Sequence, residues 1–266
     1  MNTILKYIVF CFLFCSLSIT SSSLVELSAQ NKKTAKPPKR IEWSLVKMDS
    51  LWNSSGELAS TKIIAKYKPK VDSLDIIVGT TAKELLRYPP ESPLSNLAVD
   101  IIRFRANDYL ASKGLGKADI ALTNFGGIRT VFKQGGISVS DIFSVFPFDN
   151  RIVILEIKGK YIKKMLDDFA AIERMEPLSG IELIIENKKV SKLLVGGKIV
   201  DDEKIYKLAT IDFILGGGDK IFILKKAQNV IETGILIRDA VIEYFIKETK
   251  ANRLIDANVD NRVIIK

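Results

Sequence analysis

Apolar residues along this chain follow two different spacings, one typical of helices and one typical of strands. The clearest helical signal begins at Ser92-Pro93, where a serine can cap a helix and a proline fits its first turn. The apolar residues that follow at three- and four-residue intervals are Leu94, Leu97, Ala98 and Ile101. This pattern predicts a helix over residues 93–111 that buries one face.

Four further segments have the spacing of helices. A helix is expected over residues 60–74, kinked or interrupted at Pro69 because proline lacks the amide that a helix interior needs. Another begins after Gly159, and a short helical segment is expected over residues 141–146. Residues 236–247 predict the last helix. The residues that share one face of the helix after Gly159 are Ile162, Met165, Leu166 and Phe169.

Short apolar runs bounded by glycine or polar residues predict the strands. These runs are residues 118–123, 151–157, 181–185, 190–195 and 206–213. Two of them flank Asn187-Lys188 as a hairpin, and turns are expected at Gly126-Gly127 and Gly135-Gly136. The order does not repeat a simple strand–helix–strand unit. It therefore predicts a single α+β domain of mixed sheet and helices over residues 60–266, after a polar linker and lead-in at residues 30–59.

Residues 1–29 have the features of a signal peptide. One lysine precedes an uncharged apolar stretch from Tyr7 to Ile19, and small polar residues follow it. A membrane anchor would need roughly 20 apolar residues, so cleavage is expected, with no stable membrane span in the mature form. Ala29 is one candidate for the ambiguous cleavage site. An exported protein of the periplasm or cell surface is therefore expected.

Both cysteines, Cys11 and Cys15, lie inside this signal. The mature protein would contain no cysteine, so disulfides would not contribute to its stability. Phe14 stands where a small residue is expected before a lipid-modified cysteine, and a lipoprotein anchor is therefore not favoured.

The composition of the chain argues against several kinds of binding and catalytic site. The net charge of +9 attracts anions such as phosphates, but several lysines fall in the tail QNKKTAKPPKR, and no aromatic residues interleave with a basic patch. Binding of a nucleic-acid polymer is therefore not expected. The sequence contains no histidine, which excludes Ser-His-Asp and Cys-His catalysis and metal sites that need imidazole. No pair of acids stands out as a general acid and base, so we assign neither catalytic nor metal-binding residues.

Three loops have side chains suited to binding a small ligand. Residues 124–129 read NFGGIR, in which paired glycines allow close approach, asparagine offers a donor and an acceptor, and arginine offers a planar fork. Residues 147–150 place an aromatic ring on a turn, and residues 213–219 join a second ring, three glycines and a carboxylate. Each loop taken alone favours a turn or a core contact over a ligand contact. Together, two rings and a carboxylate would describe a nucleoside pocket.

Four motifs in this order resemble the C-terminal, substrate-recognition domain of the 5'-nucleotidase family. They are NFGGIR, GGISVSDIFSVFPFDN, VILEIKGKYIKKML and YKLATIDFILGGGD, and the resemblance extends over about residues 62–247. It implies that Asn124 contacts the base and that Arg129 reaches the ribose and phosphate side. It also implies that Phe148 and Phe213 stack on opposite faces of the base, while Asp219 holds the ribose hydroxyls.

Further candidates extend this set. Asn150 is a base contact or a turn-forming residue. The glycines expected to expose the backbone to the ligand are Gly126, Gly127, Gly217 and Gly218. The sequence departs from the family at two places. Tyr88 stands where the family has an arginine, with Arg87 one residue earlier, and Lys220 follows Asp219 where the family prefers glycine.

The resemblance also determines which functions are expected. Family members hold two metals with Asp, Asn and His in an N-terminal metallophosphoesterase domain, whereas about 60 residues precede the matching region here and histidine is absent. We therefore expect no cofactor on this chain, with divalent metals on a partner chain. The leading hypothesis is the nucleoside- or nucleotide-recognition subunit of a split 5'-nucleotidase with a metallophosphoesterase partner protein. A stand-alone exported nucleoside- or nucleotide-binding protein and a degenerate structural module are the alternatives.

Overall fold

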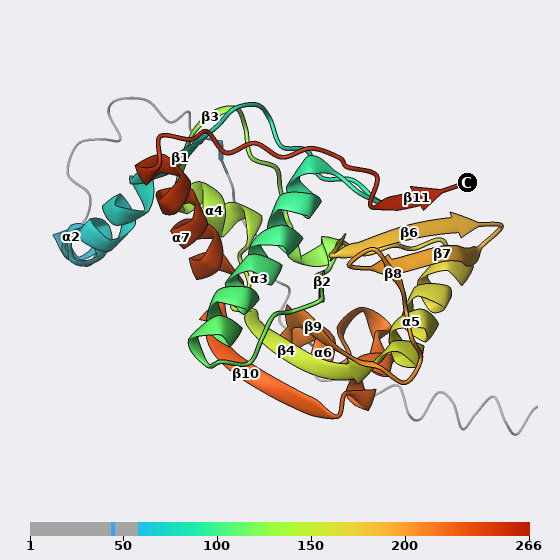
Figure 1. The fold of residues 1–266 in the computed structure, drawn as a ribbon. Helices are drawn as coiled ribbons and strands as arrows, with labels where there is room; N and C mark the ends of the chain where they lie inside the picture. Colours follow the sequence, from blue (N-terminus) through green and yellow to red (C-terminus); the bar gives the residue numbers. More distant parts are fainter. Residues whose placement is uncertain (1–43, 46–57) are drawn as a thin grey trace, which may run out of the picture. The chain divides into compact units, whose positions relative to one another are not determined.

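The computed structural model describes residues 44–45 and 58–266. The chain divides into two compact units, residues 1–56 and 57–266, and every helix and strand described here belongs to the second (Figure 1). The expected signal peptide at residues 1–29 lies outside the described residues, as does nearly all of the lead-in. No helix in the described part of the chain combines the length and apolar character needed to cross a membrane.

The largest sheet has five strands in the order β10-β4-β9-β2-β5. Strands β2 and β9 run parallel, and the other neighbouring pairs are antiparallel. Most of β4 and β9 is buried, consistent with their central positions. The strand bounds are β2 (Ile120–Leu122), β4 (Arg151–Lys158), β5 (Leu178–Ser179), β9 (Ile205–Ile211) and β10 (Asn229–Leu236).

Two smaller sheets accompany it. In one, of order β11-β6-β7-β8, the β6–β7 hairpin turns at Asn187 and Lys188, both with positive φ. This confirms the predicted hairpin. The other sheet pairs β1 with β3 antiparallel. The bounds are β1 (Ile77–Thr81), β3 (Gly135–Ser138), β6 (Ile181–Glu186), β7 (Lys189–Val195), β8 (Lys198–Ile199) and β11 (Val263–Ile265).

Helix α3 packs against the five-stranded sheet and against α7 (Figure 1). Ser92 caps α3 through a reciprocal capping box with Ser95, and the predicted apolar stripe is buried. The helices are α2 (Leu58–Asp72), α3 (Pro93–Ser112), α4 (Val139–Val145), α5 (Gly159–Ala171), α6 (Asp212–Leu215) and α7 (Ile237–Lys250). Short 3-10 helices are η3 (Ser73–Asp75), η4 (Phe125–Gly127), η5 (Gly218–Lys220) and η6 (Phe222–Lys226). The predicted α+β fold is confirmed.

Some local predictions were wrong. Helix α2 is not interrupted at Pro69, which lies in its last turn. Gly135-Gly136 opens strand β3 instead of forming a separate turn, because both residues pair with β1. Strand β9 ends at Ile211, so Phe213 lies in the helical turn α6. Strands β1, β5, β8, β10 and β11 were not predicted, since β10 contains Gly234 at a bulge and the others are short.

Substitution of Ile154 on β4 tests whether the five-stranded sheet forms the buried core. Its side chain is fully buried, and its backbone pairs with Ala209 of β9 and Ile231 of β10. We expect Ile154→Ala to lower the free energy of unfolding by about 2–5 kcal/mol, because it removes buried apolar volume and leaves a cavity. Ile199→Ala removes the same atoms from a residue that is 79% exposed and should change stability by less than about 0.5 kcal/mol. Urea denaturation measures both variants, and equal losses would contradict the assigned core.

Candidate functional site

A cavity of about 180 Å³ opens at one edge of the five-stranded sheet. Seven of the predicted site residues line it: Asn124, Gly126, Gly127, Phe148, Asn150, Phe213 and Asp219. Residues far apart in the sequence, such as Asn124 and Asp219, therefore meet in one place. The four other predicted residues, Arg87, Arg129, Gly217 and Gly218, do not line this cavity.

The strand directions explain why these loops converge. Strands β2 and β9 are parallel, so their carboxyl ends lie at the same edge of the sheet. Strand β4 is antiparallel to β9, so its amino end lies at that edge as well. Asn124 follows β2, Phe213 and Asp219 follow β9, and Phe148 and Asn150 precede β4. The sheet order β4-β9-β2 thus brings the three loops together.

Two aromatic rings remain accessible at the cavity. Phe148 and Phe213 are each 48% exposed, although large aromatic side chains usually bury most of their surface. Glycines allow the position of Phe213, because a Cβ on Gly218 would overlap its ring. Gly217 has a φ of 103°, and a Cβ there would lie 2.8 Å from the ring of Phe222. Gly218 therefore allows the position of a cavity ring, whereas Gly217 lies against Phe222, which does not line the cavity.

Asn124, which lines the cavity, has a buried and unpaired side-chain oxygen. Its side chain is 4% exposed, and Nδ2 donates to Asp219 Oδ2 at 2.6 Å, which assigns the orientation of the amide. The other amide atom, Oδ1, is buried and accepts no hydrogen bond from any described residue. A Cβ on Gly127 would lie 2.7 Å from this oxygen, so glycine is needed there. A buried unpaired acceptor is costly, and a ligand donor would satisfy it.

Arg174 binds the carboxylate oxygen of Asp219 that does not contact Asn124. Asp219 has a φ of 52°, and its Oδ1 accepts a hydrogen bond from Arg174 Nη2 at 2.7 Å. Arg174 also donates to Glu176 Oε1 through Nε and Nη2, at 3.0 and 2.7 Å. Glu176 is 2% exposed, and its Oε2 accepts the N–H of Phe125 at 2.7 Å. This chain of contacts connects the first loop to the third.

Hydrogen bonding, neighbouring charges and burial shift the pKa values of Arg174 and Glu176. Hydrogen bonding to Asp219, with the nearby Glu176 carboxylate, raises the pKa of the Arg174 guanidinium, so this side chain is charged. Burial raises the pKa of the Glu176 carboxyl, and the Phe125 N–H and Arg174 offset only part of that effect. Sequence reasoning missed both residues. The segment MEPLS around Glu176 has no motif, and its position depends on the pairing of β5 with β2.

The two other predicted arginines lie around the loops. Arg87 donates to the carbonyl of Phe125 through Nε and Nη2, at 3.1 and 2.7 Å, and its guanidinium lies 5.7 Å from that ring. Arg129 donates to the carbonyl of Gly126 at 3.2 Å and lies 6.0 Å from the ring centroid of Phe148. Both therefore contact the first loop, and Arg129 is also near a cavity ring.

Arg238 of α7 holds the second loop and was also missed. Its side chain is nearly buried and donates to the carbonyls of Phe146 and Pro147, both at 3.3 Å. It also donates to Asp149 Oδ1 at 2.6 Å. Arg238 thus holds three acceptors, on Phe146, Pro147 and Asp149, that flank Phe148. No sequence signal pointed to Arg238, because it lies far from this loop along the chain.

The groups at this site are suited to binding. Two exposed rings offer stacking surfaces, Asn124 offers an acceptor and Asp219 offers a carboxylate that is already hydrogen-bonded. Within residues 44–45 and 58–266, no group of three or more His, Cys, Asp or Glu side chains could hold a metal ion. The described residues therefore do not fit a two-metal centre, and we assign no metal-dependent step to them. Lys220 follows Asp219 with a φ of 63° and is exposed outside the cavity lining.

Known proteins match the part of the chain that contains the cavity. A family model described as "5'-nucleotidase, C-terminal domain" matches residues 77–226. Protein UshA of Escherichia coli K12 is 30% identical over 139 residues, which are 50% of this chain and 25% of UshA. A 5'-nucleotidase of Vibrio cholerae is 24% identical over 172 residues, which are 60% of this chain and 30% of that protein. The chain thus spans about a quarter to a third of these relatives.

Solved structures show the same fold. The crystal structure of a 5'-nucleotidase precursor from Thermus thermophilus matches with a TM-score of 0.64 and 24% identity, over 78% of this chain and 43% of that one. The NAD nucleotidase of Haemophilus influenzae matches with a TM-score of 0.61 and 18% identity, over 79% of this chain and 41% of that one.

The family match and the fold lead to one assignment. The matched residues include all seven that line the cavity, and they run from the start of β1 to the end of η6. The motifs of the three loops thus lie within the matched region and in the expected order. The chain belongs to the family of 5'-nucleotidase C-terminal domains.

Proposed function

We propose that this chain binds the nucleoside part of a nucleotide in the cavity between its three loops. The convergence of two half-exposed rings, an unpaired asparagine oxygen and a carboxylate on one small cavity is the observation that supports this most directly. A base stacks between Phe148 and Phe213 and donates a hydrogen bond to Asn124 Oδ1. The ribose hydroxyls donate to Asp219.

The phosphate-cleaving step belongs to another polypeptide in this proposal. The sequence contains no histidine, and the described residues offer no metal-binding cluster. The chain therefore presents the phosphate of its bound nucleotide to a metallophosphoesterase partner, which supplies the divalent metals. Arg129, next to the ring of Phe148, is placed to contact the phosphate side of such a ligand.

We place this activity outside the cytoplasm, in the periplasm or at the cell surface. The support is the amino-terminal sequence, in which one lysine, an uncharged apolar stretch and small polar residues follow one another. Nucleotides outside the cell are substrates that an exported pair of proteins can reach.

The function as a whole is tested by titrating the full chain with adenosine and AMP in a calorimeter, beside a phosphatase assay with added divalent metal. We expect binding of both ligands and no release of phosphate by this chain alone. Addition of an exported metallophosphoesterase chain should then increase AMP hydrolysis. Release of phosphate by the pure chain would contradict cleavage by a partner. Failure to bind either ligand would contradict nucleoside recognition.

Phe213→Ala tests the stacking contact. Removal of one base-stacking ring should weaken adenosine binding by about 1–3 kcal/mol. Stability should change little because the ring is half exposed. Tyr67→Ala is the matched control, since it removes a ring that is 51% exposed on α2, away from the cavity lining. Calorimetry with adenosine measures both variants. Unchanged affinity in a folded Phe213→Ala protein would remove the ring from the proposed binding mode.

The role of Asp219 is tested from the ligand side, because its substitution also releases Arg174 and Asn124. Adenosine should bind the native chain about tenfold more tightly than 2',3'-dideoxyadenosine, since the diol donates to a charged acceptor. In Asp219→Ala, the two ligands should bind with affinities within about twofold of each other, because the acceptor is gone. If the variant retains the native preference for the diol, another residue recognises the ribose.

A further inference from the structure

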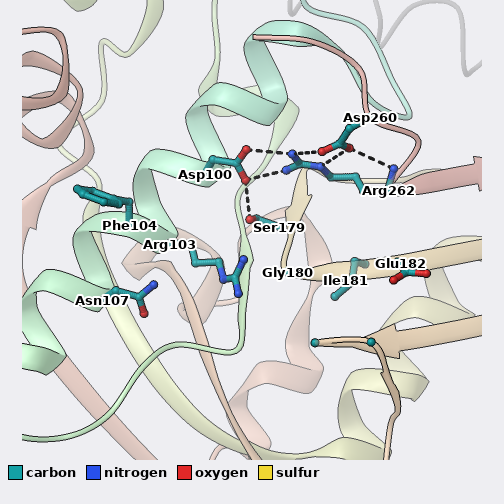
Figure 2. A pocket seen from close by; sticks show the side chains of 12 residues that line it. Asp100, Arg103, Phe104, Asn107, Ser179, Gly180, Ile181, Glu182, Asp260 and Arg262 are labelled. Carbon is teal, nitrogen blue, oxygen red and sulfur yellow. Dashed lines mark hydrogen bonds and ion pairs between the residues drawn. The ribbon is translucent and has the colours of Figure 1, made fainter. Parts of the chain in front are cut away.

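A second, larger cavity of about 550 Å³ lies beside α3 and shares no lining residue with the first. One wall is α3, and the others are the start of β6, the β7–β8 turn and the segment before β11 (Figure 2). Its lining residues from α3 are Asp100, Arg103, Phe104 and Asn107. These four occupy one face of the helix, since they are three, four and seven positions apart.

The aspartates at one end of this cavity are already paired. Arg262 donates to both oxygens of Asp100 at 2.7 and 2.9 Å, and to both oxygens of Asp260 at 2.8 and 2.7 Å (Figure 2). Ser179 also donates to Asp100 at 2.5 Å. Two carboxylates share one guanidinium, so this end of the cavity keeps a residual negative charge.

Arg103 and Asn107 have side-chain N–H donors without acceptors among the described residues. Arg103 donates through Nε to the carbonyl of Ala118 at 3.4 Å, a long contact, and its two terminal nitrogens have no partner among the described residues. Asn107 Oδ1 accepts the N–H of Ala118 at 2.7 Å, which directs the amide nitrogen away from Ala118. No described residue accepts a hydrogen bond from that nitrogen.

The backbone passes close to the head group of Arg103 at Gly180. Gly180 has a φ of 81°, and a Cβ there would overlap the carbonyl oxygen of Asp119 and lie 2.9 Å from Arg103 Cζ. Gly196 and Gly197 form the opposite turn, where a Cβ would meet no atom within 4 Å. Phe104, which is 43% exposed, also lines the cavity, and Lys247 Nζ lies 4.3 Å from the centroid of its ring. The cavity therefore combines free N–H donors with a partly exposed ring that a lysine ammonium also contacts.

We propose that this cavity binds a small organic carboxylate with an apolar or aromatic body. Arg103 offers two parallel donors that match the two oxygens of a carboxylate, and Asn107 offers a third donor. The residual charge of the Asp100–Arg262–Asp260 cluster disfavours a phosphate dianion more than a singly charged carboxylate. Phe104 packs against the body of the ligand. This site is independent of the nucleoside cavity and does not rest on its proposed function.

The probe is benzoate, titrated into the full chain and followed by ligand-observed NMR. We expect saturable binding of benzoate, weaker binding of inorganic phosphate, and binding at least about tenfold weaker for benzamide, which has the same shape without the charge. Arg103→Gln should weaken benzoate binding at least about tenfold, and Arg103→Lys should lose part of the affinity because it keeps the charge without the planar fork.

Arg151→Gln is the matched control, since it removes the same charge from an exposed arginine outside both cavities. It should leave benzoate affinity within about twofold of the native value. Circular dichroism checks that each variant is folded. Absence of saturable benzoate binding, equal binding of benzamide, or native affinity in Arg103→Gln would each overturn the proposal. If Arg103→Gln does not fold, the benzamide comparison and Arg103→Lys still decide it.

Discussion

The backbone of Phe125 is the point on which the candidate site depends, because charged side chains hold both of its polar groups. Its N–H donates to the buried Glu176, and its carbonyl accepts two hydrogen bonds from Arg87. These contacts fix the peptide groups on either side of Phe125, and with them the start of the glycine turn. Asn124 directly precedes this residue, so the direction of its side chain follows from the same clamp. The cavity takes its shape from a backbone that other elements hold in place.

Glu176 makes this clamp dependent on charge. Burial opposes ionisation of its carboxyl and raises its pKa in the folded chain, while Arg174 and the Phe125 N–H act in the other direction. A raised pKa means that the stabilisation linked to this group is fully present below its unfolded pKa and declines as the pH rises through the folded value. The same Arg174 also binds Asp219. A change at either carboxylate therefore affects both the first and the third loop.

Local patterns predicted the parts of this molecule that depend on neighbouring residues in sequence. The capped helix α3 and the β6–β7 hairpin follow from spacing and turn residues, and the family motifs identified the residues around the small cavity. Arg174, Glu176 and Arg238 could not be found in this way, because each acts on a loop that only the sheet order brings close. The same limit applies to β1, β5, β10 and β11, whose pairing partners are distant in sequence. Pairing between strands distant in sequence determines these positions, and the spacing of apolar residues does not reveal it.

Each loop of the cavity is held by an arginine that does not line it. Arg87 holds the first loop by two hydrogen bonds, Arg238 holds the second by three, and Arg174 holds the third by one hydrogen bond to Asp219. A guanidinium is suited to this task because its donors lie in one rigid plane and its charge persists at any physiological pH. Loops fixed in advance spare a ligand the entropic cost of ordering them. The half-exposed rings of Phe148 and Phe213 thus lie on loops that side chains outside the cavity lining hold in place.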